Sequence, residues 1–94
     1  MEKFMIVVLL PAYNEEESLP RLMPKLQATL TKFGEDYKII VCNDGSKDKT
    51  QELFEEYARS MPVEIIRHKI NRGLGESSRD LFERASEVTQ PGDV

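Results

Sequence analysis

The run of apolar residues from Phe4 to Leu10 constrains the fold of this chain more than any other feature of its sequence. The run is continuously apolar and β-branched in its middle, which is typical of a strand covered on both faces, as in a parallel sheet. It is far shorter than the ~20 residues that a membrane span needs. It also has neither the charged leader nor the small-residue cleavage site of a signal peptide. We expect Pro11 to end this strand.

A helix is predicted directly after the first strand, over residues 19–33. Ser18 is its expected N-cap, Pro20 fits the first turn, and Gly34 is a natural stop. Pro24 is expected to kink the helix or to divide it into two. The predicted inner face consists of apolar residues at helical spacing, namely Leu19, Leu22, Met23, Leu26, Leu30 and Phe33.

The same alternation continues to the end of the chain. Strands are predicted over 37–42 and 63–67, and helices from Asp48 and over 76–88. Asp48 with Gln51 forms a capping-box-like start for the second helix. Its expected inner residues are Leu53, Phe54, Tyr57 and Ala58, and those of the third helix are Leu74, Ser78, Leu81, Phe82 and Ala85. After a turn at Pro91-Gly92, residues 93–94 look like the start of a fourth strand, so we expect the chain to be a piece of a longer one.

Strands that alternate with helices indicate an α/β fold, a Rossmann-like open parallel sheet with right-handed crossovers. The 94 residues are enough for one domain and not for two. The net charge of −4 argues against a nucleic-acid binder that relies on overall charge. A single cysteine cannot form an internal disulfide, and we expect a cytoplasmic protein.

Polar and turn-forming residues gather in the three loops that follow the strands. In an open α/β sheet these loops lie at the carboxyl edge, where ligands bind. Each loop also has a purely structural interpretation, because Asn and Asp are common turn residues, Ser46 or Asp48 can cap a helix, and an isolated Gly-x-Gly is a weak phosphate signal. The loops contain Pro11, Ala12, Tyr13, Asn14 and Glu15; Asn43, Asp44, Gly45 and Ser46; and Lys69, Asn71, Arg72, Gly73 and Gly75.

Two further residues are assigned structural roles. Cys42 lies in a strand and is expected to be a small core residue. His68 has no Cys or His partner at metal-binding spacing, so we expect a solvated loop histidine.

Taken together, the loops form an ordered set: Pro-Ala-Tyr-Asn-Glu at 11–15, Asn-Asp-Gly-Ser-x-Asp-x-Thr at 43–50, and Asn-x-Gly-x-Gly at 71–75. This set resembles the N-terminal half of the GT-A-fold inverting glycosyltransferases, the large family that includes dolichol-phosphate mannose synthases and polysaccharide synthases. The resemblance implies a sheet order of 3-2-1, with a missing fourth strand beside the first. It also implies that residues 1–94 are the N-terminal nucleotide-binding part of a single GT-A domain, truncated before its metal motif.

The resemblance further implies a site for a nucleotide-diphospho-sugar. Pro11 and Tyr13 would frame the base and ribose, and Glu15 would accept hydrogen bonds from ribose hydroxyls. Asp44 would accept from an N–H on the base edge. Arg72, with Lys69 and Arg79 as weaker candidates, would contact the base or offset the diphosphate charge.

Two departures from the family pattern limit this expectation. The commoner second motif has two consecutive acidic residues, and this chain has Asn43 before Asp44. The Asp-x-Asp motif that binds a divalent metal (Mg or Mn) in such enzymes would lie beyond Val94, as would the catalytic base. We therefore expect no catalytic residue and no metal ligand within this chain. The acceptor would be a polyprenyl phosphate or a growing glycan.

Two alternatives from other classes stay open at this point: a dinucleotide-binding oxidoreductase domain and a non-catalytic α/β interaction module. The first needs its glycine fingerprint after the first strand, whereas Gly73 and Gly75 follow the third. Without a fourth strand, the first strand would be an unprotected sheet edge, so we expect the chain to self-associate through it.

Overall fold

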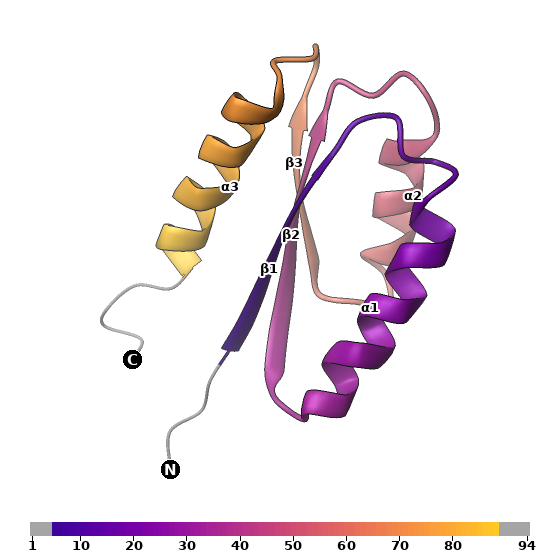
Figure 1. Cartoon of the computed structure of the whole chain (residues 1–94), viewed down its shortest axis with the longest axis vertical. Helices are drawn as coiled ribbons and strands as arrows, with labels where there is room; N and C mark the ends of the chain where they lie inside the picture. Colours follow the sequence, from indigo (N-terminus) through magenta and orange to yellow (C-terminus); the bar gives the residue numbers. More distant parts are fainter. Residues whose placement is uncertain (1–4, 89–94) are drawn as a thin grey trace.

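The computed structural model describes residues 5–88, and in it three strands alternate with three helices. The expected turn at Pro91-Gly92 and the expected start of a fourth strand lie outside the described residues. In chain order (Figure 1), the elements are β1 (Met5–Ala12), α1 (Leu19–Phe33), β2 (Asp36–Asp44), α2 (Thr50–Tyr57), β3 (Val63–His68) and α3 (Leu74–Val88).

The three strands form one parallel sheet in the order β1-β2-β3, with β2 in the centre. Met5 of β1 is opposite Asp36 of β2, and Ile39 of β2 is opposite Val63 of β3. This arrangement confirms the predicted α/β class, the open parallel sheet and the strand order. Because the chain crosses from strand to strand through helices, all three carboxyl ends meet at one edge.

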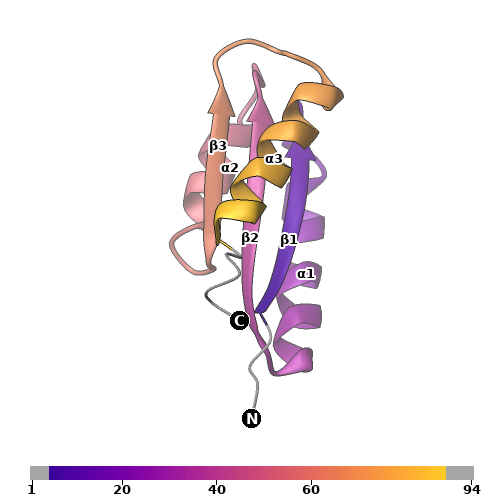
Figure 2. The ribbon, with the colours of Figure 1, turned by 90° about the vertical axis from the view of Figure 1, so that its left-hand side faces the viewer.

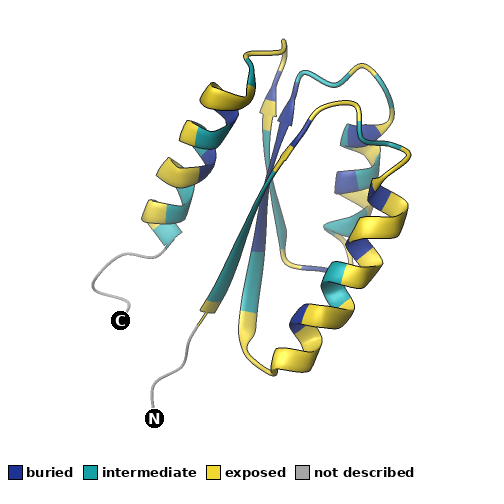
Figure 3. Cartoon of the chain, in the orientation of Figure 1, coloured by how far each residue is buried: buried dark blue, intermediate teal, exposed yellow. Residues whose placement is uncertain are grey.

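The helices cover both faces of the sheet. Figure 1 shows α1 and α2 on one face and α3 on the other, and Figure 2 shows α3 lying across β2 and β1. Burial follows this division, with fully covered residues in β2 and on the inner sides of the helices (Figure 3). The larger cluster contains Ala12, Leu19, Met23, Leu30, Ile39, Val41, Phe54 and Met61, and the smaller one Ile40, Cys42 and Leu81.

We expected Pro11 to end the first strand, but the strand continues past it. β1 continues through Pro11, opposite Cys42, to Ala12. Proline is tolerated in a strand whose N–H side lacks a partner, and among the described residues β1 pairs on one side only.

The predicted bounds of α1 are correct, and its Pro24 does not divide it. Ser18 occupies the N-cap position, but its side chain makes no capping hydrogen bond. Pro20 lies in the first turn as expected, and Gly34 ends the helix in the left-handed conformation with φ +71°.

The predicted capping box of α2 is wrong. The N-cap position is Lys49, not Asp48, and the side chain of Lys49 makes no capping hydrogen bond. Gln51 is instead bonded to the side chains of Asn43 and Glu55, and Asp48 turns its carboxylate to other partners that are described below. The inner face of α2 is as expected, with Phe54 buried and Leu53 and Tyr57 packed against the core.

In α3, two residues expected to face inward are exposed: Leu74 at 69% and Phe82 at 67%. Phe82 is one residue past the buried Leu81, which turns it by about 100° around the helix axis. Leu74 is the first residue of α3 and lies beside a pocket rather than over the sheet. Arg84 ties α3 to β3 by donating from two guanidinium nitrogens to the carboxylate of Glu64.

Within residues 5–88, no helix combines the length and the apolar character that crossing a membrane requires.

Candidate functional site

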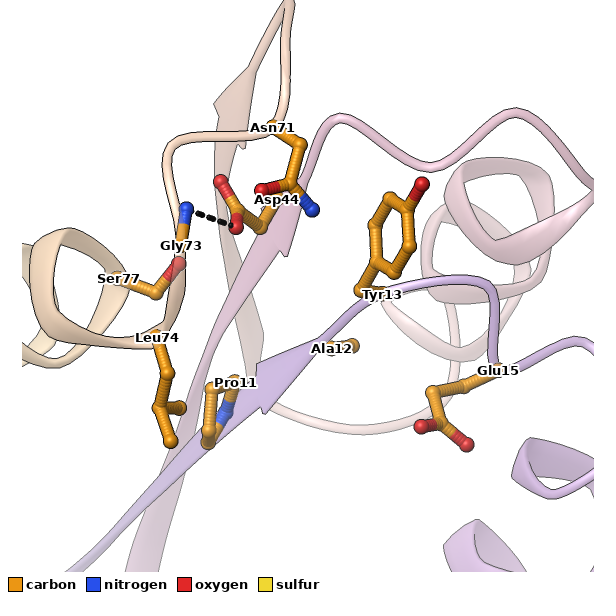
Figure 4. A pocket seen from close by; sticks show the side chains of 9 residues that line it. All are labelled: Pro11, Ala12, Tyr13, Glu15, Asp44, Asn71, Gly73, Leu74 and Ser77. Atoms are coloured by element: carbon orange, nitrogen blue, oxygen red, sulfur yellow. Dashed lines mark hydrogen bonds between the residues drawn. The ribbon is translucent and has the colours of Figure 1, made fainter.

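A pocket of about 320 Å³ opens at the carboxyl edge of the sheet. The end of β1, the end of β2 and the loop from β3 into α3 all contribute to it (Figure 4). The residues that line it are Pro11, Ala12, Tyr13, Glu15, Asp44, Asn71, Gly73, Leu74 and Ser77. Its wall is therefore built from all three loops in which the sequence gathers polar and turn-forming residues.

Asp44 holds the third loop against the end of β2. Its Oδ1 accepts the backbone N–H of Arg72 at 2.8 Å, and its Oδ2 accepts the backbone N–H of Gly73 at 2.9 Å. Oδ1 also lies 2.7 Å from Nδ1 of His68. The sequence suggested that Asp44 is a turn residue or a hydrogen-bond acceptor for the nucleotide base. The structure adds a role in ordering the loop at residues 71–73.

The carboxylate of Asp44 is ionised and still has acceptor capacity. Burial pushes its pKa upward, but the hydrogen bonds from His68 and from the Arg72 and Gly73 amides outweigh this and hold the pKa below its usual value. A carboxylate has about four lone-pair positions, and the contacts above occupy two on Oδ1 and one on Oδ2. One position on Oδ2 is not occupied by these contacts.

His68 is not the solvated loop histidine that the sequence suggested. It is the last residue of β3 and only 7% exposed. Its Nδ1 faces Asp44, and its Nε2 lies 2.5 Å from Oδ2 of Asp80 in α3. These two hydrogen bonds, first that with Asp44 and then that with Asp80, raise the pKa of the imidazole. The prediction failed because the two carboxylates that hold His68 lie 24 residues before it and 12 residues after it in the sequence. Such distant partners do not show up as a local motif.

Gly45 lets the second and third loops touch. Its φ is +72°, a conformation that side chains disfavour. A Cβ on Gly45 would also lie 2.5 Å from the carbonyl carbon of Ile70 and closer still to the backbone nitrogen of Asn71. Glycine is therefore required here both by the backbone angle and by the close approach of the neighbouring loop.

The first and second loops are joined by a separate network of hydrogen bonds. The backbone N–H of Glu15 donates to Oγ1 of Thr50 at 2.8 Å, and that of Glu16 donates to Oδ2 of Asp48 at 3.2 Å. Oδ1 of Asp48 accepts the backbone N–H of Thr50 at 2.9 Å. This network accounts for the Asp-x-Thr part of the second motif, which positions the pocket wall rather than contacting the pocket.

Asn14 completes this connection in a left-handed conformation with φ 51°. Its backbone N–H donates to Oγ of Ser46, and its Oδ1 accepts the backbone N–H of Lys47, both at 2.9 Å. Asn43, which stands where the family more often has an acid, is bonded to Gln51 of α2 at 2.8 Å. Successive strand residues point to opposite faces, so Asn43 faces α2 while Asp44 faces the side of α3.

Four of the five predicted nucleotide contacts come together at the pocket: Pro11, Tyr13, Glu15 and Asp44. The fifth, Arg72, contributes its backbone N–H to Asp44, but its side chain is exposed and does not line the pocket. The weaker candidates Lys69 and Arg79 are exposed as well.

Leu74 and Ser77 line the pocket although the sequence did not indicate it. Ser77 is 1% exposed, and its hydroxyl, which lies beside the Cys42 thiol, has no hydrogen-bond partner of ordinary geometry. Their three-residue separation at the start of a helix places both on one side of its first turn, a signal that was available in the sequence. Cys42 is a fully buried core residue, and burial raises the pKa of its thiol.

Comparison with known proteins identifies the family. The sequence model described as "Glycosyl transferase family 2" matches residues 7–87, which contain the whole pocket and all of the described elements except the first two residues of β1 and the last residue of α3. The chain belongs to glycosyl transferase family 2. The resemblance noted in the sequence is thereby confirmed, and the oxidoreductase alternative is set aside.

Curated relatives of this family-2 chain carry one recurring description. The chain is 41% identical over 73 residues to an undecaprenyl-phosphate 4-deoxy-4-formamido-L-arabinose transferase of Pectobacterium atrosepticum, and 34% identical over 71 residues to one of Pseudomonas fluorescens. The matches cover 78% and 76% of this chain, but only 22% and 21% of those relatives. The chain thus corresponds to about a fifth of the length of the relatives it matches.

The family commonly uses a divalent metal, which would need a group of ligands such as carboxylates or imidazoles. Residues 5–88 contain no group of three or more His, Cys, Asp or Glu side chains arranged to hold a metal ion. The nearest arrangement, Asp44 with Asp80, is bridged by His68. Because both ring nitrogens of His68 are hydrogen-bonded to these carboxylates, the group does not fit a metal centre.

Proposed function

We propose that residues 1–94 are the N-terminal, nucleotide-binding part of a single GT-A domain in a glycosyltransferase. The parent enzyme would transfer a sugar from a nucleotide-diphospho-sugar to a polyprenyl phosphate. Family membership supports the reaction class, and the names of the relatives support the acceptor. The observation that carries the proposal is the pocket itself, which lies at the carboxyl edge of a parallel sheet, where α/β folds bind nucleotides.

The pocket supplies the contacts that a nucleoside requires. The exposed ring of Tyr13 and the ring of Pro11 offer flat surfaces for a base or a ribose. Glu15 has its backbone N–H fixed by Thr50 and its carboxylate at the pocket wall, where it would accept from ribose hydroxyls. The remaining acceptor position of Asp44 would take an N–H from the base edge.

The diphosphate is proposed to lie toward the exposed side chain of Arg72, outside the pocket lining. The metal (Mg or Mn) and the catalytic base are proposed to be bound by, or to belong to, sequence beyond Val94. On this basis the 94-residue chain binds the nucleotide but does not transfer sugar. The parent enzyme is proposed to be cytoplasmic, with any membrane association provided outside this chain.

The chain is also proposed to self-associate through β1. Among the described residues this strand has one pairing partner, and its sequence carries no inward charge, no proline before Pro11 and no bulge signal. A two-fold dimer joining two copies of β1 antiparallel is the simplest arrangement.

Calorimetric titration of the chain with UDP, GDP and dTDP tests the binding function. We expect one of these nucleotides to bind, and Glu15→Ala to weaken it by about 1.5–3 kcal/mol, the usual contribution of a hydrogen bond to a charged group. Asp44→Ala should weaken binding by at least as much, because it also releases the loop at 71–73.

Two variants serve as controls for this titration. Glu17→Ala removes a neighbouring exposed carboxylate, and Glu52→Ala removes one on the outer side of α2. Both should bind like the wild type. A chain that binds none of the three nucleotides would instead support the remaining alternative, a non-catalytic interaction module.

A further inference from the structure

His68 and Asp80 form a charged cluster with Asp44 that the proposed nucleotide contacts do not use. The cluster joins three elements: Asp44 ends β2, His68 ends β3, and Asp80 lies in the second turn of α3. The side chains of His68 and Asp44 are both only 6% exposed, whereas that of Asp80 is 30% exposed. Two of the three members are therefore buried, and one of these two, Asp44, lines the pocket.

The hydrogen bonds fix the protonation state of the cluster. Ionised carboxylates accept hydrogen bonds and cannot donate them. Oδ1 of Asp44 lies 2.7 Å from Nδ1 of His68, and Oδ2 of Asp80 lies 2.5 Å from Nε2. With both carboxylates ionised, both ring nitrogens act as donors, so His68 is then an imidazolium and the cluster has a net charge of −1.

The imidazolium determines how the carboxylate of Asp44 is presented. Oδ1 is held by His68 and by the Arg72 amide, and Oδ2 is bonded to the Gly73 amide. Oδ2, with one contact, is thus the oxygen of this pocket-lining residue that has an acceptor position free. Loss of a proton from either ring nitrogen removes the positive charge beside Oδ1 and weakens the hold on the carboxylate of Asp44. Where Nδ1 is the nitrogen that loses it, a lone pair also faces Oδ1 and repels it.

Few other charges act on the ring. From β2, the Cys42 thiol lies 3.8 Å from Nε2 and is neutral because burial raises its pKa. From β3, the neighbouring Arg67 and Lys69 have exposed side chains. The two carboxylates are therefore the main electrostatic partners of His68.

Resting on the proposed function, we propose that His68 and Asp80 are positioning residues for the nucleotide site. The charged imidazole, oriented by Asp80, holds Asp44 in the geometry that accepts from the base. Nucleotide affinity is then constant while His68 is protonated and falls as pH rises through the titration of His68. The paired carboxylates shift that fall to a pH above the ordinary histidine range, because they favour the charged ring.

Asp80→Asn is the principal test, since Asp80 is partly exposed and does not line the pocket. Removing one of the two carboxylates lowers the pKa of His68. Nucleotide affinity, measured by calorimetry with UDP, GDP and dTDP from pH 6 to pH 10, should then fall at a lower pH than in the wild type. Glu83→Gln, an exposed charge loss in the same helix, is the matched control and should leave the profile unchanged.

His68→Asn gives a second, independent readout. Its amide can still donate to Asp44 but carries no charge and does not titrate. We expect affinity to drop by about tenfold, the factor equivalent to one pKa unit, and the alkaline fall to disappear. Wild-type affinity and an unchanged pH profile in both His68→Asn and Asp80→Asn would overturn the proposal.

A titration without nucleotide separates this proposal from the proposed function. In nuclear magnetic resonance spectra, the Arg72 and Gly73 amide protons, both bonded to Asp44, should shift together with the His68 ring as pH rises. If no nucleotide binds but these amides follow His68, the proposed function fails and the coupling within the cluster stands. Amides that do not follow His68 would overturn the positioning role whether or not nucleotide binds.

Discussion

Replacing Gly45 with alanine isolates the contact between the second and third loops. The substitution adds one methyl group to a residue with φ +72°, at a distance of 2.5 Å from the Ile70 carbonyl carbon. Gly34→Ala is a close control, because Gly34 has φ +71° and nothing lies within 4 Å of the position of its Cβ. Both variants strain the backbone equally, and only Gly45→Ala collides with a neighbouring loop.

The loss of folding stability expected for each variant follows from this geometry. A left-handed residue other than glycine costs about 1–2 kcal/mol, which is the whole effect expected for Gly34→Ala. At Gly45, overpacking against rigid backbone adds about 1–3 kcal/mol. If the loop moves away, Asp44 also loses hydrogen bonds from the Arg72 and Gly73 amides, at about 1 kcal/mol each. Gly45→Ala should therefore destabilise the chain by roughly 2–5 kcal/mol, whether the loop stays in place or moves away.

Urea unfolding followed by far-ultraviolet circular dichroism provides the assay, since the chain has no tryptophan. We expect the free energy of unfolding to fall by about 2 kcal/mol more in Gly45→Ala than in Gly34→Ala. Equal losses in the two variants would refute the reasoning, because they would show that the loops do not touch at Gly45.

Three further outcomes are expected. Thr50→Val, which removes the acceptor of the Glu15 amide, should destabilise the chain by about 1–3 kcal/mol, whereas Thr29→Val on the exposed side of α1 should have little effect in the same unfolding assay. Burial raises the pKa of Asp48, but hydrogen bonds, chiefly from Thr50, outweigh this and hold it below its usual value of 3.8. The contribution of the ionised carboxylate to folding stability is therefore present above that value and is lost as pH falls through the folded-state pKa. The stability difference between wild type and Asp48→Asn should be smaller at pH 3 than at pH 7. Light scattering at micromolar concentration should report a dimer or larger species, and a monomer would remove β1 as an association surface.

Local patterns in the sequence predicted most of the fold. The apolar run at the start of the chain, the bounds of α1 and the glycine at its end each depend on neighbouring residues, and each appears as expected. On the predicted inner face of α1, Leu22 and Phe33 are instead exposed. The errors concern non-local partners. Pro11 was expected to end a strand, but an edge strand accommodates it. Phe82 was expected inside, but α3 presents Leu81 to the sheet.

In the site, too, local motifs could be predicted from the sequence and contacts between distant residues could not. Motif residues identified the carboxyl edge and seven of the nine residues that line the pocket, four of them as expected nucleotide contacts. The sequence did not reveal that Asp44 accepts from amides 28 and 29 residues further along the chain, or that His68 bridges to Asp80. These contacts depend on how the third loop and α3 return to the sheet, which no local spacing records.

Mapping nucleotide binding residue by residue tests the central claim most directly. Amide spectra of the labelled chain would be recorded with increasing amounts of the nucleotide that binds most tightly among UDP, GDP and dTDP. The account predicts that the largest shifts fall on Tyr13, Glu15, Gly73 and Ser77, around the pocket. Shifts centred away from the carboxyl edge of the sheet, or no shifts at millimolar nucleotide, would contradict it.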